Sequence, residues 1–204
     1  QDSISLYFVF PETEDFDKIW LDNDVFLNYN YPKNPWTLGV VTFDGLNSSG
    51  KPYDWTTGAI DWSDQLTSKP IFLGNKDISD SLYLSFYFQA GGFGETPDSD
   101  DSLILEFYTP SKKEWNTIWS TNGFDSDQWY YEHIQLDSSK YFQDGFRFRF
   151  SSYGSLNGSL DHWNLDYVYF NESRSLYDTL MQDWAFTSPP ITMLDNYSSV
   201  PWKH

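Results

Sequence analysis

The chain has 204 residues, 21% of them aromatic, and a formal net charge of −18. Its length suits one domain with a single buried core. The negative charge excludes a nucleic-acid backbone as the main partner, because such binding needs clustered Lys and Arg, and it opposes docking on an anionic lipid surface. The chain contains no cysteine, which excludes disulfides, thiol catalysis and thiolate metal sites.

Alternation of apolar and polar residues with period two recurs along the chain, whereas helical periodicity is not sustained. In the stretch 81–92, for example, Leu82, Leu84, Phe86 and Phe88 alternate with Ser and Tyr, so one face is apolar. The pattern predicts extended segments at residues 18–29, 37–46, 64–73, 81–92, 101–110, 114–123, 129–137, 145–154 and 162–170. Gly, Asn, Asp and Pro clusters separate these segments and mark turns.

Strands of this length, joined by turns and not by helices, predict an all-β fold, an antiparallel β-sandwich of the jelly-roll type. We expect the sandwich domain to occupy residues 1–174, with an extended N-terminal region. Residues 175–204 are expected to form a C-terminal arm or linker, in which 175–186 is the one stretch that could be helical.

The run from Asp64 to Phe170 resembles the MAM-like and concanavalin-like jelly-roll modules of secreted and surface proteins. The resemblance is carried by "DQLTSKPIFL" (64–73), by "LSFYFQAGGFG" (84–94) with the hairpin after it, and by "HWNLDYV" (162–168). The upstream phrase "TFDGLNSSGKPYDW" (42–55) is similar to exported Bacteroidota proteins. The resemblance therefore implies an exported protein that is periplasmic, outer-membrane-associated or on the cell surface, as the start "QDSISLYF" without Met also suggests.

The polar residues of "GSLDHWNLDYVYF" (158–170) raise the question of a metal site. Alternation places His162, Asn164, Asp166 and Val168 on one face, and Trp163, Leu165, Tyr167 and Tyr169 on the other. By resemblance, Asp166 with Asp161, and Asp64 from the first strand of the module, would bind a structural Ca²⁺, an ion that takes six to eight oxygen ligands. The acidic loop 95–101 could contribute further ligands. The alternative is that these Asp side chains are hydrogen-bonded structural groups, and that no cofactor is bound.

No catalytic signature is present in the sequence. The three His residues lack the H-E-x-x-H spacing of zinc hydrolases, and neither G-x-S-x-G, a P-loop nor the E-x-D-x-x-E strand of concanavalin-like glucanases occurs. We therefore expect a protein that is not an enzyme.

Aromatic residues at expected turns and edges are the other candidates for function. Trp36, Trp55, Trp62 and Trp129 could form a platform that stacks on sugars, or could pack in the core and at its rim. The "NPW" (34–36) and "VPW" (200–202) phrases resemble docking arms in which Pro presents an aromatic anchor, Trp36 or Trp202.

The sequence therefore favours a non-catalytic module of an exported cell-envelope protein that works by protein–protein contact. Its partner would be another envelope or outer-membrane protein, as in an accessory subunit of the type 9 secretion and gliding machinery, without membrane insertion. The alternative is a glycan-binding module, with or without dependence on calcium.

Overall fold

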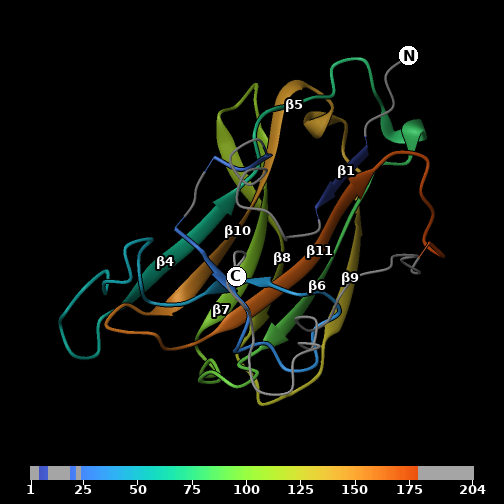
Figure 1. Ribbon diagram of the computed structural model, residues 1–204. Helices are drawn as coiled ribbons and strands as arrows, with labels where there is room; N and C mark the ends of the chain where they lie inside the picture. Colours follow the sequence, from blue (N-terminus) through green and yellow to red (C-terminus); the bar gives the residue numbers. More distant parts are fainter. Residues whose placement is uncertain (1–4, 9–18, 22–23, 179–204) are drawn as a thin grey trace, which may run out of the picture.

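The computed structural model describes residues 5–8, 19–21 and 24–178. For residues 5–8 it describes the backbone alone. Two antiparallel sheets pack face to face in a β-sandwich (Figure 1). The strands are β1 (Ser5–Phe8), β2 (Phe26–Asn28), β3 (Val40–Phe43), β4 (Ile60–Thr67), β5 (Ile71–Phe72), β6 (Tyr83–Ala90), β7 (Ser102–Thr109), β8 (Glu114–Asn122), β9 (Tyr130–Gln135), β10 (Asp144–Ser155) and β11 (Trp163–Asn171). The expected all-β sandwich is confirmed.

One sheet has the strand order β2-β3-β11-β6-β9, with β1 also paired to β11, and we call it the β11 sheet. The other has the order β4-β10-β7-β8, with β5 paired to β10, and we call it the β10 sheet. In Figure 1, β11 and β6 run side by side in one layer, and β10 and β4 run side by side in the other. In the described part of the chain, no helix is long and apolar enough to cross a membrane.

Alternating aromatic residues from both sheets meet between the layers. Phe86 and Phe88 of β6 and Phe148 and Phe150 of β10 are all buried in one cluster. The Phe86 and Phe150 rings meet edge to face, with centroids 4.9 Å apart. Burying each such side chain stabilises the fold by about 2–3 kcal/mol. The apolar face expected for 81–92 is therefore the core face of β6.

Two of the expected extended segments differ from the structure. Among the described residues of 18–29, the regular strand is β2, and Trp20 adds an isolated bridge to Ser68. The segment 64–73 is divided into β4, which already begins at Ile60, and the short β5. The division lies at Ser68–Pro70, and Pro70 has no N–H to donate to a sheet ladder.

The face assignment predicted for 162–170 is correct for its first half and wrong for its second half. Trp163 and Leu165 are fully buried in the core as expected, but Val168 and Phe170, not Tyr167 and Tyr169, continue the core face. The cause is a register shift in the β6–β11 pairing between Asp166 and Tyr169, where Tyr167 adopts φ 50°. A β-bulge of this kind adds one residue and reverses the inward and outward positions after it.

The expected C-terminal arm, including Trp202 and most of the 175–186 stretch, lies outside the described residues. The proposed boundary at residue 174 therefore stays a prediction.

Candidate functional site

The outer face of the β10 sheet carries a row of aromatic and charged side chains. Because Phe148 and Phe150 of β10 point into the core, the residues between and beside them point away from it. The ladders bring outward residues of β4, β7 and β8 beside them, since Tyr153 pairs with Trp62 and Tyr108 pairs with Trp115. We call this surface the aromatic strip. It consists of Trp62, Gln65, Glu106, Tyr108, Trp115, Arg147, Arg149, Ser151 and Tyr153.

Each end of the aromatic strip is a pair of aromatic rings. At one end the Trp62 and Tyr153 rings lie 5.6 Å apart, and Trp62 is 48% exposed. At the other end the Tyr108 and Trp115 rings lie 5.1 Å apart. Along β10, Tyr153 and Arg147 are six residues apart, which in an extended strand corresponds to about 20 Å.

Two arginines lie against the aromatic rings of Tyr108 and Trp115 at the second end of the aromatic strip. The guanidinium carbon of Arg147 lies 4.2 Å from the Tyr108 ring centroid, and that of Arg149 lies 4.3 Å from the Trp115 ring centroid. Such cation–π contacts hold the rings in fixed orientations. Arg149 also forms an ion pair with Glu106 on the neighbouring strand.

The centre of the aromatic strip contains polar side chains and is bordered by one apolar residue, Ile104. Ser151 is 1% exposed, and its hydroxyl has no hydrogen-bond partner among the described residues. Gln65 and Ile104 flank it across the ladders. The surface therefore offers rings at its two ends, and amide, carboxylate and guanidinium groups between them.

The outer face of the β11 sheet is closed by the loop 29–39. Gln89 and Asn164 on this face are fully buried, and Gln89 exchanges hydrogen bonds with the backbone of Lys33 in that loop. Thr37 of the same loop donates to Asp166. Of the two outer faces, the one on the β10 sheet is therefore the better candidate for contact with an extended ligand.

The tryptophans singled out from the sequence lie in different places. Trp62 belongs to the aromatic strip. Trp36 is 53% exposed and lies against Tyr87 of the β11 sheet. Trp55 is 77% exposed in the loop before β4, and Trp129 donates its indole N–H to the backbone oxygen of Lys33.

Trp115 was not anticipated from the sequence. It shares β8 with Trp119, which packs against the core. The pairing of β7 with β8 shifts register between Leu105 and Glu106, at a point between Trp115 and Trp119 on β8. Simple alternation along β8 therefore does not show which of the two tryptophans faces out.

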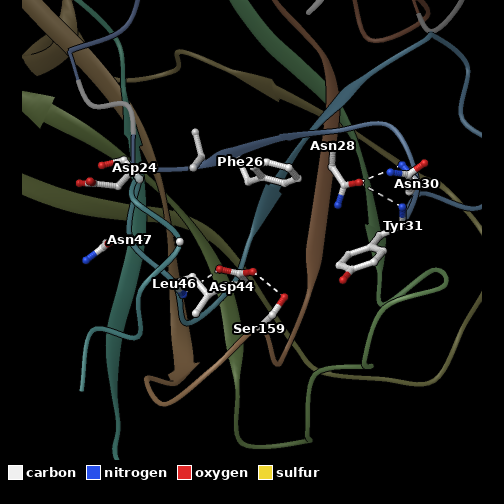
Figure 2. Close-up of a pocket in the computed structure, with 12 residues that line it drawn as sticks. Asp24, Phe26, Asn28, Asn30, Tyr31, Asp44, Leu46, Asn47 and Ser159 are labelled. Atoms are coloured by element: carbon white, nitrogen blue, oxygen red, sulfur yellow. Dashed lines mark hydrogen bonds between the residues drawn. The ribbon is translucent and has the colours of Figure 1, made fainter. Parts of the chain in front are cut away.

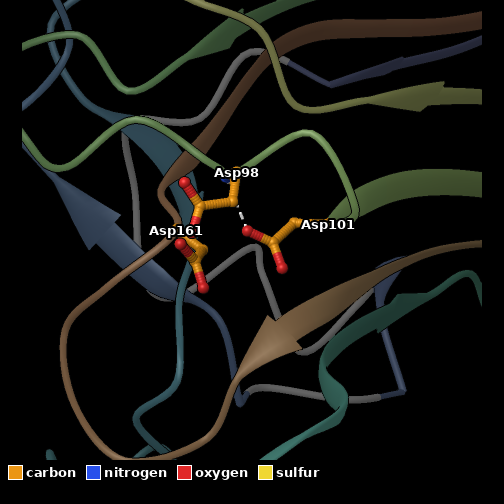
Figure 3. A group of neighbouring side chains, drawn as sticks. All are labelled: Asp98, Asp101 and Asp161. Atoms are coloured by element: carbon orange, nitrogen blue, oxygen red, sulfur yellow. Dashed lines mark hydrogen bonds between the residues drawn. The ribbon is translucent and has the colours of Figure 1, made fainter. Parts of the chain in front are cut away.

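Three carboxylates meet at one end of the sandwich (Figure 3). Asp98 and Asp101 come from the acidic loop before β7, and Asp161 comes from the loop before β11. One oxygen of each lies within 4.8 Å of the others. The backbone N–H of Asp98 donates to Asp101, which folds the loop into a tight turn, and the N–H of Ser155 donates to Asp161.

This carboxylate cluster has the chemistry that Ca²⁺ requires. Asp101 and Asp161 are 3% and 7% exposed, and burial together with the charge of Asp161 raises the pKa of Asp101 to about 7. A Cβ at Gly154 would lie 3.1 Å from an oxygen of Asp161 and 3.2 Å from one of Asp101, so the glycine lets both carboxylates lie close to β10. Hard carboxylate oxygens are the ligands that a calcium ion takes.

The other two carboxylates predicted as calcium ligands lie outside this cluster. Asp166 is fully buried and accepts hydrogen bonds from Thr37 and from the N–H of Tyr167. Asp64 is 1% exposed and accepts from the N–H of Asp44 and the hydroxyl of Tyr53. Burial raises the pKa of Asp64 to about 8. Of the predicted ligands, only Asp161 has carboxylate neighbours close enough to share an ion with it in the described part of the chain.

Asp64 should make the stability of the protein depend on pH. Its pKa is about 8 in the folded chain and ordinarily 3.8, so its contribution is complete below pH 3.8 and is lost as the pH rises through 8. Each pH unit between the two pKa values corresponds to about 1.4 kcal/mol. The Asp64 carboxyl therefore lowers the free energy of unfolding by about 5 kcal/mol between pH 4 and 8. Urea unfolding at several pH values should show that the free energy of unfolding changes less with pH in Asp64→Asn than in the wild-type protein. The exposed Asp137→Asn should keep the wild-type slope, and an unchanged slope in Asp64→Asn would contradict the assignment.

A hydrogen-bonded chain joins Asp44, Ser159 and His162, but it is not arranged for nucleophilic catalysis. The N–H of Glu95 donates to Nδ1 of His162 at 2.9 Å, which assigns the ring proton to Nε2. Nε2 then donates to Ser159 Oγ at 2.9 Å, and Ser159 donates to Asp44 at 2.9 Å. A catalytic serine must instead give its proton to the imidazole. This series of hydrogen bonds therefore orients Asp44 and does not activate Ser159.

No protein-family model matches the chain, and no curated protein matches it. Several solved structures are similar. One is the CBM22-1–GH10 part of xylanase 10B from Clostridium thermocellum, complexed with xylohexaose: identity is 12%, the TM-score is 0.49, and the match covers 90% of this chain and 30% of that one. The module TmCBM61, in complex with β-1,4-galactotriose, has 11% identity, a TM-score of 0.42 and coverages of 76% and 86%.

A third similar structure is TmCBM27, a module described as recognising mannan, with 10% identity, a TM-score of 0.39 and coverages of 85% and 100%. Identities and TM-scores this low assign neither a family nor a ligand. The resemblance to MAM-like modules and to exported Bacteroidota proteins stays a prediction.

Proposed function

We propose that the protein is a non-catalytic carbohydrate-binding module that holds an extended polysaccharide along the aromatic strip. The observation that carries the proposal is the pair of aromatic ends, Trp62 with Tyr153 and Trp115 with Tyr108, on one outer sheet face. Trp62 is exposed, and the other three rings are half-buried. The binding of a glycan thus replaces protein–protein contact as the leading hypothesis.

The chemistry of a sugar chain matches this surface. A pyranose ring presents an apolar C–H face, which packs on an aromatic ring, and a rim of hydroxyls, which donate and accept hydrogen bonds. Arg149, Glu106 and Gln65 supply the donors and acceptors between the two aromatic ends. The rings of Trp115 and Tyr108 are already fixed by the arginines, so binding loses little side-chain entropy.

The same surface lacks the arrangement that glycoside hydrolysis needs. That reaction uses two carboxyl groups about 5–10 Å apart on either side of the bond to be broken. Glu106 is the carboxylate of the aromatic strip, and it is engaged in an ion pair with Arg149. We therefore infer binding without cleavage.

We also propose that Asp98, Asp101 and Asp161 hold a structural Ca²⁺, which would join the loop before β7 to the loop before β11. Two buried carboxylates that repel each other, Asp101 and Asp161, together with the exposed Asp98, support this. The ion would neutralise their charge without taking part in sugar binding, since the cluster contributes no residue to the aromatic strip.

The predicted location of the protein, exported and associated with the cell envelope, is compatible with capture of extracellular polysaccharide. We retain it as a proposal that fractionation of the native cells would test. Trp36, one anchor of the alternative docking hypothesis, lies against Tyr87, and Trp202 lies outside the described residues.

The proposal is tested by affinity electrophoresis in gels that contain one soluble polysaccharide each. Xylan, galactan and mannan form the first panel, because the similar structures are described with a xylose oligomer, a galactose oligomer and mannan. We expect at least one polysaccharide to retard the wild-type protein, and no reducing sugar to be released on prolonged incubation. Migration unaffected by every polysaccharide would contradict the proposal, and release of sugar would contradict its non-catalytic part.

A further inference from the structure

A pocket lies on the β11 sheet, outside the aromatic strip. It has a volume of about 480 Å³ and lies between β2 and the loop that follows β3 (Figure 2). This volume falls within the range of small-molecule pockets, about 300–1,000 Å³. Its lining includes Asp24, Phe26, Asn28, Tyr31, Asp44 and Ser159.

Asn28 lines the pocket and has an unmet hydrogen-bond donor, Nδ2, which is itself buried. Its side chain is 2% exposed, and its Oδ1 accepts the N–H groups of Asn30 and Tyr31 at 2.9 and 3.1 Å. These two bonds fix the orientation of the amide, because a nitrogen in that place could not accept them. Nδ2 therefore points away from the turn, toward the space above Asp44 and Ser159 in Figure 2, and has no partner in the described part of the chain.

The opposite side of the pocket presents fixed acceptors. Asp44 accepts hydrogen bonds from the N–H of Leu46 and from Ser159, and the hydrogen-bonded chain through His162 holds Ser159 in place. The Tyr31 ring stands edge-on to the His162 ring with centroids 4.9 Å apart, so it is held too. At the rim, Phe26 exposes 60% of its surface.

We propose that this pocket is a second saccharide site, which takes a single neutral hexose unit. A ligand that satisfies the pocket must accept a hydrogen bond from Asn28 Nδ2 and donate to carboxylates such as Asp44. An ammonium group or a metal ion cannot accept that bond, whereas a hydroxyl does both. The Phe26 and Tyr31 rings provide the apolar surface for the C–H face of the sugar.

The pocket and the aromatic strip act separately. The pocket is built from β2 and the residues beside it, from the loop after β3 and from Ser159 before β11, whereas the aromatic strip is built from β4, β10, β7 and β8. The pocket suits one sugar unit, while the aromatic strip suits a run of several. The inference therefore goes beyond the proposed function and can fail independently of it.

The test is an NMR titration of the ¹⁵N-labelled protein with methyl glucoside, methyl galactoside and methyl mannoside. Asn28→Asp keeps the Oδ1 acceptor for the turn and removes the Nδ2 donor. The side-chain amide signal that disappears in this variant is that of Asn28. We expect at least one glycoside to shift this signal saturably. Asn28→Asp and the rim variant Phe26→Ala should each raise the dissociation constant about tenfold or more, measured on the backbone signals of the pocket.

Trp62→Ala is the matched control, since it should reduce retention by polysaccharide and leave the methyl-glycoside titration unchanged. The proposal is overturned when none of the three glycosides moves the Asn28 signal. It is also overturned when Trp62→Ala abolishes the shift, because the sugar would then bind at the aromatic strip. Phe26 is exposed, so its variant should remain folded and informative even where Asn28→Asp is unstable.

Discussion

Replacing Trp115 by alanine should weaken binding of the retained polysaccharide about 30-fold, the effect expected of an aromatic hot spot. The substitution removes the ring that stacks on sugar and also the surface on which Arg149 lies 4.3 Å from the centroid. Trp62→Ala should have a similar effect at the other end of the aromatic strip. Isothermal titration calorimetry with an oligosaccharide of the retained glycan measures both.

Trp36→Ala is the control for this experiment. Trp36 is about as exposed as Trp62, at 53% against 48%, but it lies beside Tyr87 of the β11 sheet. Its loss should leave glycan affinity unchanged. If Trp36→Ala weakened binding while Trp62→Ala and Trp115→Ala did not, the glycan site would lie on the other sheet. Circular dichroism should confirm that all three variants are folded.

Calcium should stabilise the protein strongly. A ligand that binds only the folded chain adds about 4 kcal/mol at a thousandfold excess over its dissociation constant, which for a domain of this size corresponds to about 10 °C in Tm. Thermal unfolding with calcium and with a chelator measures the difference. Asp161→Asn should abolish it, whereas the exposed Asp125→Asn should not.

The calcium effect should also depend on pH. The pKa of Asp101 is raised to about 7, so the folded chain without metal holds a proton there that Ca²⁺ must displace. The gain in Tm should therefore be largest near pH 8 and shrink as the pH falls to 5. Without calcium the same group acts in the opposite sense, because its stabilising contribution is lost as the pH rises through 7. A Tm insensitive to calcium at pH 8 would contradict the metal proposal.

The all-β sandwich and much of its core could be predicted from the sequence. Alternation is a local property, and in 81–92 it identifies Leu82, Leu84, Phe86 and Phe88 as core residues without reference to any partner strand. The sequence also indicated Trp62 and the acidic loop 95–101 as candidates for function, and it contains none of the catalytic signatures considered above.

Which side chains share a site could be known only from the folded structure. Register shifts at Asp166–Tyr169 and at Leu105–Glu106 change which residues face out, and a bulge depends on the partner strand and not on local sequence. The approach of Asp161 to Asp98 and Asp101, far apart along the chain, follows from strand order. So does the placing of Trp62 and Trp115 on one face. Contacts of this kind are fixed by how the two sheets pair and pack, which no alternation along a single segment records.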